Sequence, residues 1–471
     1  MTGKGYKVSM DCQKKLHKPF YAFEYEGLRF AYHYALGTCV KLSEEAYNCL
    51  DRFQKTDSVG DTFGALAQEI EKLKARGFFS PYQFPIPDDR EFESLLVRRY
   101  ATVWTKLELA LSERCNLACR YCYCGTCRDE IPNSGIMAEA IARLAINGLF
   151  AVSGKSKNLH ITFFGGEPLM NKPVLKFAVA YSQRLAAIHG KTVTYSMTTN
   201  GTLLDDEIIT IIKKYNFGLM VSLDGPQKLH DAQCPTRGGD GSYDAAVGGI
   251  RKLMARRRRV TVRCTMAHPA PNMMSLVRFF EDFGFSRIVL GRVYNPVYPS
   301  CCDLTKADFA DLEHQMNAEV VPWMLEELRA DRTPKYFPFS GVVEKKAEDP
   351  SAIISPFKCG ACRGTTTVGA DGIFYPCHRF VGMKEWIVGS VDQGPNIEKC
   401  KMFWRKYRAL VKANCFECWA YPLCHGPCPW EVAKPDGTFA INKRHCEEMM
   451  IWLKQGFWFE SLYNRMKEER R

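Results

Sequence analysis

The chain has 471 residues, of which 46% are hydrophobic and 25% charged, a composition typical of soluble globular proteins. This length suffices for about two to four domains, and no run of about 18 apolar residues predicts a membrane span. The formal net charge is +12, but the arginine run 256–259 lies where a helix is expected to end, so nucleic-acid binding is not predicted. The N-terminal segment has no apolar core of a secretory signal, and we expect a cytoplasmic protein without membrane contact.

Residues 1–90 are predicted to form a small winged-helix-like unit. Three strands are expected, at Phe20–Tyr25, Leu28–Tyr34 and Thr38–Leu42. Glu26 and Gly27 separate the first two, whose aromatic residues alternate at a period of two, and this pattern predicts a hairpin. Two amphipathic helices follow, and the second ends at Gly77. The segment Pro81–Asp89 contains three prolines and is interpreted as a linker that lets the unit move independently.

Residues 100–335 alternate short apolar strands with amphipathic helices. The expected strands are Leu107–Leu111, Leu159–Phe164, Val193–Met197, Phe217–Leu223, Val260–Thr265 and Arg287–Val293. Apolar strands joined by helices predict an α/β fold in which helices cover a parallel sheet. Six βα units are two short of a closed (β/α)8 barrel, so we expect a partial (β/α)6 barrel. In α/β barrels the chemistry lies at the carboxyl ends of the strands.

Three cysteines follow the first of these strands. Cys115, Cys119 and Cys122 are spaced C-x3-C-x2-C, with Tyr121 before the third. An iron–sulfur cube is normally held by four cysteines, so three thiolates leave one iron open. The amino and carboxylate groups of S-adenosylmethionine (SAM) can chelate that iron, and one electron then cleaves the sulfonium to a 5′-deoxyadenosyl radical. From spacing alone, half of a zinc site or a redox cluster that includes Cys124 and Cys127 is the alternative.

Small polar motifs end the next strands. Gly165-Gly166-Glu167 follows the second strand, Asn200 the third and Asp224 the fourth. Each alone is also typical of an ordinary βα turn, although glycines additionally let a ligand approach the backbone closely. Together with the cysteine motif they resemble the SAM-binding motifs of the radical SAM fold. The resemblance implies SAM contacts from Gly165, Gly166, Glu167, Ser196, Asn200, Ser222, Asp224 and Arg263.

Cysteines are concentrated again in residues 345–471. Cys359-x2-Cys362 precedes Gly372 and Cys377, and C-x2-C-x5-C-x3-C then begins at Cys415, with Cys446 last. Zinc knuckles are the alternative on spacing alone. The pattern resembles the SPASM domain of radical SAM maturases, which implies two auxiliary 4Fe–4S clusters and three 4Fe–4S clusters in all. The implied ligand sets are Cys359, Cys362, Cys377 and Cys428 for the first auxiliary cluster, and Cys415, Cys418, Cys424 and Cys446 for the second. Cys234 and Cys400 lie outside these patterns and are expected to be ordinary thiols.

From about residue 106 to 450 the chain therefore resembles radical SAM/SPASM maturases. The N-terminal unit resembles a RiPP recognition element, which binds the leader of a precursor peptide by adding it as a strand to a sheet edge; a purely structural cap is the alternative. These resemblances imply a maturase that cross-links a ribosomally synthesised precursor peptide, most simply through a cysteine thioether. C–C and C–O bonds remain open. A reducing partner such as flavodoxin or ferredoxin is also implied.

Two other functions are compatible with parts of this pattern. Anaerobic sulfatase-maturing enzymes, which form formylglycine, resemble the barrel and SPASM regions. They carry an aspartate directly after the cysteine that corresponds to Cys377, where this chain has His378, and they lack the N-terminal unit. An iron–sulfur electron carrier or peptide-binding scaffold is the non-enzymatic alternative, but neither needs the SAM-binding motifs.

Overall fold

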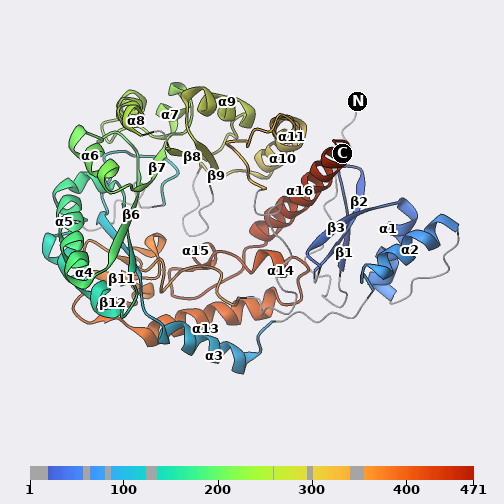
Figure 1. Ribbon diagram of the computed structural model, residues 1–471, viewed down its shortest axis with the longest axis horizontal. Helices are drawn as coiled ribbons and strands as arrows, with labels where there is room; N and C mark the ends of the chain where they lie inside the picture. Colours follow the sequence, from blue (N-terminus) through green and yellow to red (C-terminus); the bar gives the residue numbers. More distant parts are fainter. Residues whose placement is uncertain are drawn as a thin grey trace.

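The structure is a computed structural model that describes residues 20–34, 36–56, 64–79, 86–123, 135–257, 259–293, 301–339 and 355–470. Cys124 and Cys127 lie outside the described residues, as does residue 258 of the arginine run. A ten-stranded sheet forms the centre of the molecule, and a separate three-stranded sheet lies beside the long C-terminal helix (Figure 1).

Six parallel strands form one end of the large sheet, up to its edge, in the order in which they occur along the chain. They are β4 (Lys106–Ser112), β5 (Asn158–Gly165), β6 (Thr192–Thr199), β7 (Gly218–Ser222), β8 (Thr261–Met266) and β9 (Arg287–Arg292). The helices between them are α4 (Glu139–Val152), α5 (Lys172–His189), α6 (Asp206–Lys214), α7 (Gln227–Gln233), α8 (Tyr243–Arg256) and α9 (Met273–Phe283). The predicted α/β fold with six βα units is confirmed, and each predicted strand lies within two residues of the observed one.

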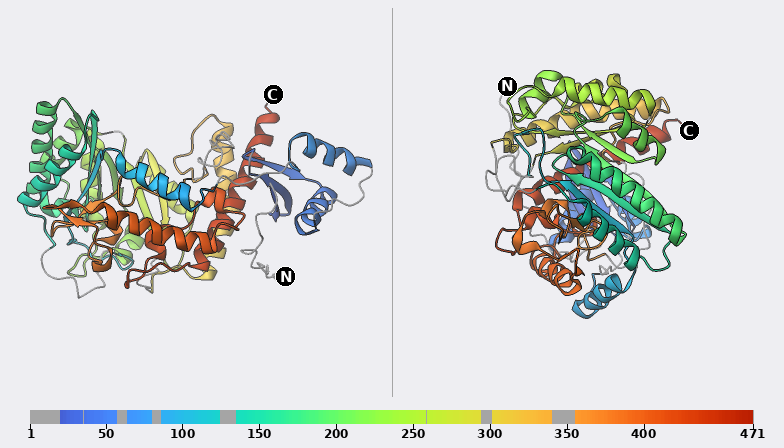
Figure 2. Two further views of the ribbon diagram at one scale, coloured as in Figure 1. Left: turned by 90° about the horizontal axis from the view of Figure 1, so that it is seen from below. Right: turned by 90° about the vertical axis from the view of Figure 1, so that its left-hand side faces the viewer.

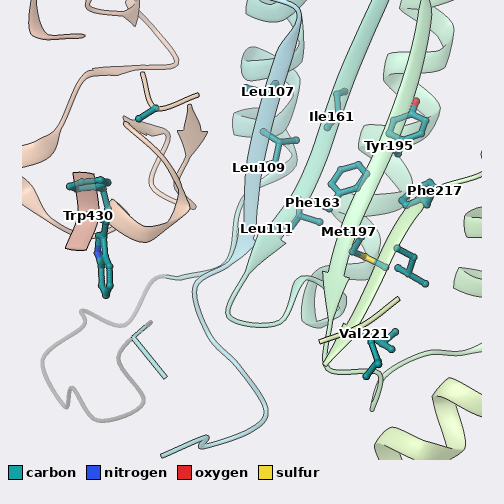
Figure 3. Close-up of a cluster of buried hydrophobic side chains, with 14 of the residues drawn as sticks. Leu107, Leu109, Leu111, Ile161, Phe163, Tyr195, Met197, Phe217, Val221 and Trp430 are labelled. Carbon is teal, nitrogen blue, oxygen red and sulfur yellow. The ribbon is translucent and has the colours of Figure 1, made fainter. Parts of the chain in front are cut away.

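Alternating residues give this sheet two different faces. Leu107, Leu109 and Leu111 on β4 lie beside Ile161 and Phe163 on β5, and all five are buried in the main core (Figure 3). Successive side chains of a strand point to opposite faces, so the residues between them face the inside of the curved sheet. The inner face is therefore available for polar side chains and a ligand.

The cysteine-rich region extends the same sheet beyond β4. Strand β10 (Thr367–Val368) pairs in parallel with β4, and the antiparallel strands β11 (Ile373–Tyr375), β12 (Gly389–Ser390) and β13 (Gly394–Pro395) follow. Its helical segments are η3 (His378–Phe380), η4 (Lys384–Trp386), α13 (Ile397–Asn414), α14 (Tyr421–Cys424), α15 (Pro429–Val432) and α16 (Lys443–Glu468). The hydrogen bonds between β10 and β4 fix the C-terminal cysteines close to the start of the barrel.

Further helices join these parts. They are α3 (Asp89–Ala101), the short η1 (Pro168–Asn171), α10 (Lys306–Gln315), the π-helical η2 (Met316–Val320) and α11 (Val321–Arg329). Helix α3 begins inside the predicted linker, because Asp88 and Glu91 form a capping box at its first turn. Among the described helices, none is long and apolar enough to cross a membrane.

The N-terminal sheet is packed on both faces. It consists of β1 (Phe20–Tyr25), β2 (Leu28–His33) and β3 (Thr38–Leu42), followed by α1 (Glu44–Thr56) and α2 (Gly64–Ala75). Phe20 and its neighbours on one face pack against these two helices. On the other face, Tyr21 stacks on Trp419 with ring centroids 4.0 Å apart, and Tyr32 stacks on Phe457 of α16 at 4.4 Å. Figure 2 shows α16 running along this sheet. The expectation of an independently moving unit is thus wrong, because these contacts attach the sheet to the C-terminal region.

Candidate active site

The loop after β4 carries the first cysteine group and packs on the backbone that follows β5. Three thiols lie on it, those of Cys115, Cys119 and Cys122. Gly166 N donates to Ser112 O at 2.7 Å, and a Cβ on Gly165 would lie 2.0 Å from that same carbonyl oxygen. Gly165 also has a φ of 141°, which favours glycine. Glycine is therefore needed at positions 165 and 166 because the backbone of the cysteine loop passes so close to them.

Glu167 joins the carboxyl ends of two strands. Its carboxylate accepts hydrogen bonds from Leu169 N at 3.0 Å, Thr199 Oγ1 at 2.8 Å and Asn200 N at 2.8 Å. The side chain is 1% exposed, and burial raises its pKa to about 7, although the hydrogen bonds act to lower it. Glu167 thus places Asn200 of the β6 loop next to the cysteine loop.

Hydrogen-bond donors surround the first cysteine. Leu117 N lies 3.4 Å and Asn200 Nδ2 3.7 Å from Cys115 Sγ, and the same amide nitrogen donates to Asn116 Oδ1 at 3.0 Å. Burial raises the pKa of Cys115 to about 12, so a thiolate at this position needs a positive partner. This donor set fits an iron–sulfur cluster, whose sulfur ligands commonly accept hydrogen bonds from the protein.

Asp224 is fully engaged within the protein. Its carboxylate accepts from Thr265 N at 2.8 Å, Tyr121 OH at 2.6 Å and Cys234 Sγ at 3.4 Å, and the residue is 1% exposed. Burial raises the pKa of Asp224. Through Tyr121, this residue holds the cysteine loop against β7 and β8. Cys234 also contacts Cys119, so it is not an isolated thiol.

The remaining SAM candidates lie on the inner face of the sheet. Ser196 Oγ hydrogen-bonds to His160 Nε2 and to Thr162 Oγ1, both at 2.9 Å. Ser222 pairs in register with Arg263 on β8. The structure therefore brings the eight predicted residues to the carboxyl ends and inner face of β5 to β8. Contacts with the cysteine loop come from Gly165, Gly166, Glu167, Asn200 and Asp224.

The first predicted auxiliary set is also assembled in space. Burial raises the pKa of Cys377, and the nearby thiols of Cys428 and Cys359 raise it further. The thiol of Cys362 is completely buried, and its closest thiols are those of Cys400 on α13 and of Cys377. Cys400, expected to be an ordinary thiol, thus adjoins Cys362, one of the four predicted ligands.

The second predicted set lies around α14 and the start of α16. Cys415 and Cys424 share Tyr407 as a neighbour, Cys418 lies near Tyr34 of the N-terminal sheet, and Cys446 is in the first turn of α16. In the described parts of the chain, no three Cys, His, Asp or Glu side chains converge closely enough to hold one metal ion. The cysteines of a 4Fe–4S cluster each bind a different iron, so a wider spacing of the thiols is compatible with that group.

Sequence reasoning missed a group of residues between the two cysteine regions. Glu108 Oε1 lies 3.0 Å from His378 Nδ1 and accepts from Thr367 Oγ1 at 2.6 Å. Arg379 lies over the rings of Tyr123 and Trp430. Each of the residues 123, 378, 379 and 430 follows a predicted cluster cysteine by one or two positions, and this proximity was the available signal.

The buried carboxyl group of Glu167 gives a pH prediction. Its pKa of about 7 in the folded protein lies above the ordinary value of 4.5, so the folded state binds the proton more tightly. The resulting stabilisation is complete below pH 4.5 and is lost as the pH rises through about 7. The Glu167→Gln side chain cannot ionise. Between pH 4.5 and about 7 we therefore expect the free energy of unfolding of the wild type to fall by about 3 kcal/mol relative to this variant. Chemical denaturation of both proteins on either side of the window measures this; a difference independent of pH would contradict it.

Comparison with known proteins agrees with this geometry. Residues 109–283 match the Radical SAM superfamily. The matched range is therefore a radical SAM domain, and it includes the loop of Cys115 to Cys122. Enzymes with this domain use SAM and a 4Fe–4S cluster. Its α/β architecture with a mostly parallel sheet is the radical SAM fold.

Relatives and solved structures extend the likeness beyond this domain. The chain is 24% identical over 359 residues to a cysteine-type anaerobic sulfatase-maturating enzyme of Clostridium novyi, covering 69% of this chain and 88% of that one. It is 21% identical over 452 residues to the radical SAM cyclopropyl synthase TigE of Paramaledivibacter caminithermalis, covering 90% and 91%. The structure of anSMEcpe with bound AdoMet is similar with a TM-score of 0.62 at 19% identity, covering 77% of this chain and all of that one. SuiB of Streptococcus suis bound to S-adenosylmethionine has a TM-score of 0.53 at 14% identity, covering 90% and 98%.

Proposed function

We propose that the protein is a radical SAM maturase that installs a cross-link, in the first instance a cysteine thioether, in a ribosomally synthesised precursor peptide. The observation that carries this proposal is the N-terminal sheet fused to the barrel and the cysteine-rich region. The likeness to TigE and to SuiB covers 90% of the chain, whereas the likeness to the Clostridium novyi enzyme covers 69%. The N-terminal sheet would bind the leader of the precursor peptide and so bring the core peptide to the barrel.

In this proposal the cysteine groups hold three 4Fe–4S clusters. Cys115, Cys119 and Cys122 would hold the cluster that binds SAM, and the two C-terminal sets of four would hold the auxiliary clusters. When bound, SAM and this cluster would supply the radical chemistry that removes a hydrogen atom from a carbon of the peptide. Asn200 and the backbone at Gly165 and Gly166 adjoin this cluster loop, and Ser196, Ser222 and Arg263 line the inner face beneath it. Asp224 acts through Tyr121, keeping the loop in place.

The electron balance explains the need for further clusters. Joining a C–H carbon to a thiol sulfur removes two electrons and two protons. One electron and one proton leave together as the hydrogen atom that 5′-deoxyadenosine retains. The thiol proton passes to solvent or a base, and the second electron needs an acceptor. Cys359, Cys362, Cys377 and Cys428 would hold that acceptor, and a flavodoxin or ferredoxin would supply the electron that starts each cycle.

Two alternatives each have an observation in their favour. The name of TigE describes a cyclopropyl synthase, which favours C–C bond formation by the same kind of oxidation. The likeness to sulfatase-maturating enzymes favours formation of formylglycine. Against the latter, His378 occupies the position where those enzymes carry an aspartate, and its ring contacts Phe164 on the inner face with centroids 4.2 Å apart.

The test uses the full chain, reconstituted anaerobically with iron and sulfide, and a cysteine-containing precursor peptide encoded beside its gene. We expect about 12 iron atoms per chain, four for each of three clusters. With dithionite and SAM, 5′-deoxyadenosine should form and the peptide should lose two hydrogens together with its free thiol. Loss of two hydrogens with the thiol retained would support a C–C or C–O bond instead. An aldehyde at the cysteine would support sulfatase-type chemistry, and zinc in place of iron would overturn the cluster assignment.

A further inference from the structure

Arg379 lies against two aromatic rings, which also contact each other, at the junction of the cysteine regions. Its guanidinium carbon lies 4.9 Å from the centre of the Trp430 ring and 5.4 Å from that of Tyr123. The two rings themselves are 5.5 Å apart in a T-shaped contact. Tyr123 directly follows Cys122, and Trp430 follows Cys428 by two residues. The stack therefore connects the loop of the SAM-binding cluster to the ligands of the first auxiliary cluster.

Nearby carboxylates compensate this cation only weakly. In the described part of the chain its one ion pair is with Glu431, at 4.0 Å, and that carboxylate lies nearer to His445, at 3.2 Å. Glu108, the other carboxylate beside Cys377, is engaged by His378 and Thr367. The Arg379 side chain is 28% exposed, so water screens its charge only in part. The cationic guanidinium of Arg379 is thus fixed beside the first auxiliary ligand set, with one carboxylate facing it at 4.0 Å.

Two predicted ligands of that cluster, Cys428 and Cys377, are among the groups that interact with this charge, and Cys428 interacts most strongly. Burial lowers the pKa of Arg379, but interaction with Cys428 first, and with Tyr123, Glu431 and Cys377, outweighs burial and raises it. A guanidinium remains protonated at all working pH values, and its stacking on two rings keeps it in place. The potential of an iron–sulfur cluster depends on nearby charge, hydrogen bonds and solvent exposure. A fixed cation stabilises the reduced, more negative state of a cluster.

We propose that Arg379 is a positioning residue that raises the reduction potential of the cluster at Cys359, Cys362, Cys377 and Cys428, so that this cluster accepts the electron released during cross-linking. This inference rests on the proposed function, because it takes that cluster as the electron acceptor. The direction of electron flow then depends on the charge of one side chain that is not itself a cluster ligand.

The test is a redox titration of the reconstituted full chain, followed by electron paramagnetic resonance. The Cys115, Cys119, Cys122→Ala background removes the overlapping signal of the SAM-binding cluster. In this background Arg379→Gln should lower the midpoint potential so that the ratio of reduced to oxidised cluster falls at least tenfold, which is about 59 mV for one electron. Arg379→Lys keeps the charge and should restore most of the shift. Arg332→Gln removes a cation that is 61% exposed and paired with Glu327, and it should leave the potential unchanged.

The negative charge of Glu431 provides an independent test of the same inference. Glu431→Gln removes the carboxylate that faces Arg379 and should raise the midpoint potential. An unchanged potential in Arg379→Gln with full iron content would overturn the inference while leaving the proposed function intact. If Arg379→Gln loses iron, its potential cannot be compared and the Glu431→Gln variant decides. A midpoint potential of Glu431→Gln that does not rise above that of the background protein then overturns the inference. Absence of any iron–sulfur signal from the background protein would instead refute the proposed auxiliary cluster.

Discussion

Replacing Cys115, Cys119 and Cys122 together by alanine is expected to abolish the release of 5′-deoxyadenosine completely. Only a cluster with three protein ligands leaves an iron open for SAM, and these three thiols lie on one loop at the carboxyl end of β4. The C-terminal sets have four thiols each and lie on other elements, so their clusters should remain. Chromatography of dithionite-reduced reaction mixtures measures the loss, and iron should fall from about 12 to about eight atoms per chain.

A matched control removes a cysteine that is far from these groups. Cys49 is buried on α1 against the N-terminal core, and Cys49→Ala should keep both its iron and its 5′-deoxyadenosine. If the triple variant still produced 5′-deoxyadenosine at the wild-type rate, the radical chemistry would have been placed at the wrong cluster. A loss of all iron from the triple variant would show instead that the three sites do not assemble independently.

The barrel could be predicted from sequence because its strands are apolar runs separated by amphipathic helices. Strands β10 to β13 could not, since segments of two or three residues have no measurable periodicity. The packing of the N-terminal sheet did leave a signal. Phe20–Tyr21–Ala22–Phe23 is a continuous apolar run, which is typical of a strand covered on both faces, yet the proline-rich linker favoured an independently moving unit.

The cysteine positions could likewise be found from spacing, but their surroundings could not. The hydrogen bond of Tyr121 to Asp224 joins residues 103 positions apart. Asp224 was expected to contact SAM, but through this bond it supports the cysteine loop. Arg379 acquires its role only when the loops after Cys122 and Cys428 meet. Short-range patterns predict candidate ligands of a metal group, whereas the charges that surround these ligands are set by the tertiary fold.

Within the described residues, β3 is paired with another strand on one side only, and its other edge provides the second large expected effect. Strand β1 is one edge, where Ala22 N donates to Gln54 Oε1 at 2.5 Å and therefore points away from β2. Ala22 pairs with Ala31, and Ala31 with Val40. A residue of an antiparallel strand turns its N–H and C=O to the same side, so Ala31, which does not bond to Ala22, bonds to Val40. The amide of the next residue, Lys41, therefore points away from β2, to the edge of β3 that no strand of the described residues covers.

Lys41→Pro is expected to weaken binding of the precursor leader roughly tenfold or more and to reduce cross-linking accordingly. Proline removes the N–H that points away from β2 and leaves the hydrogen bonds to β2 intact. A main-chain carbonyl of the bound leader would then lack its donor, which costs about 1–3 kcal/mol of binding free energy. Release of 5′-deoxyadenosine without peptide should be unchanged, since the cysteine loop lies in the barrel. Fluorescence anisotropy with a labelled leader, and mass spectrometry of the full-length precursor, measure the two effects.

A point variant separates peptide binding from folding, which deletion of the whole unit would not. Deletion would expose Trp419, now stacked on Tyr21 beside Cys418, and so disturb the second auxiliary site. Lys41→Ala removes the same side chain but keeps the amide, and it should bind the leader like the wild type. If Lys41→Pro bound and modified the full-length precursor as well as Lys41→Ala does, strand addition at β3 would be refuted. The N-terminal sheet would then be a structural cover for the cysteine-rich region, and the sulfatase-maturase alternative would gain weight.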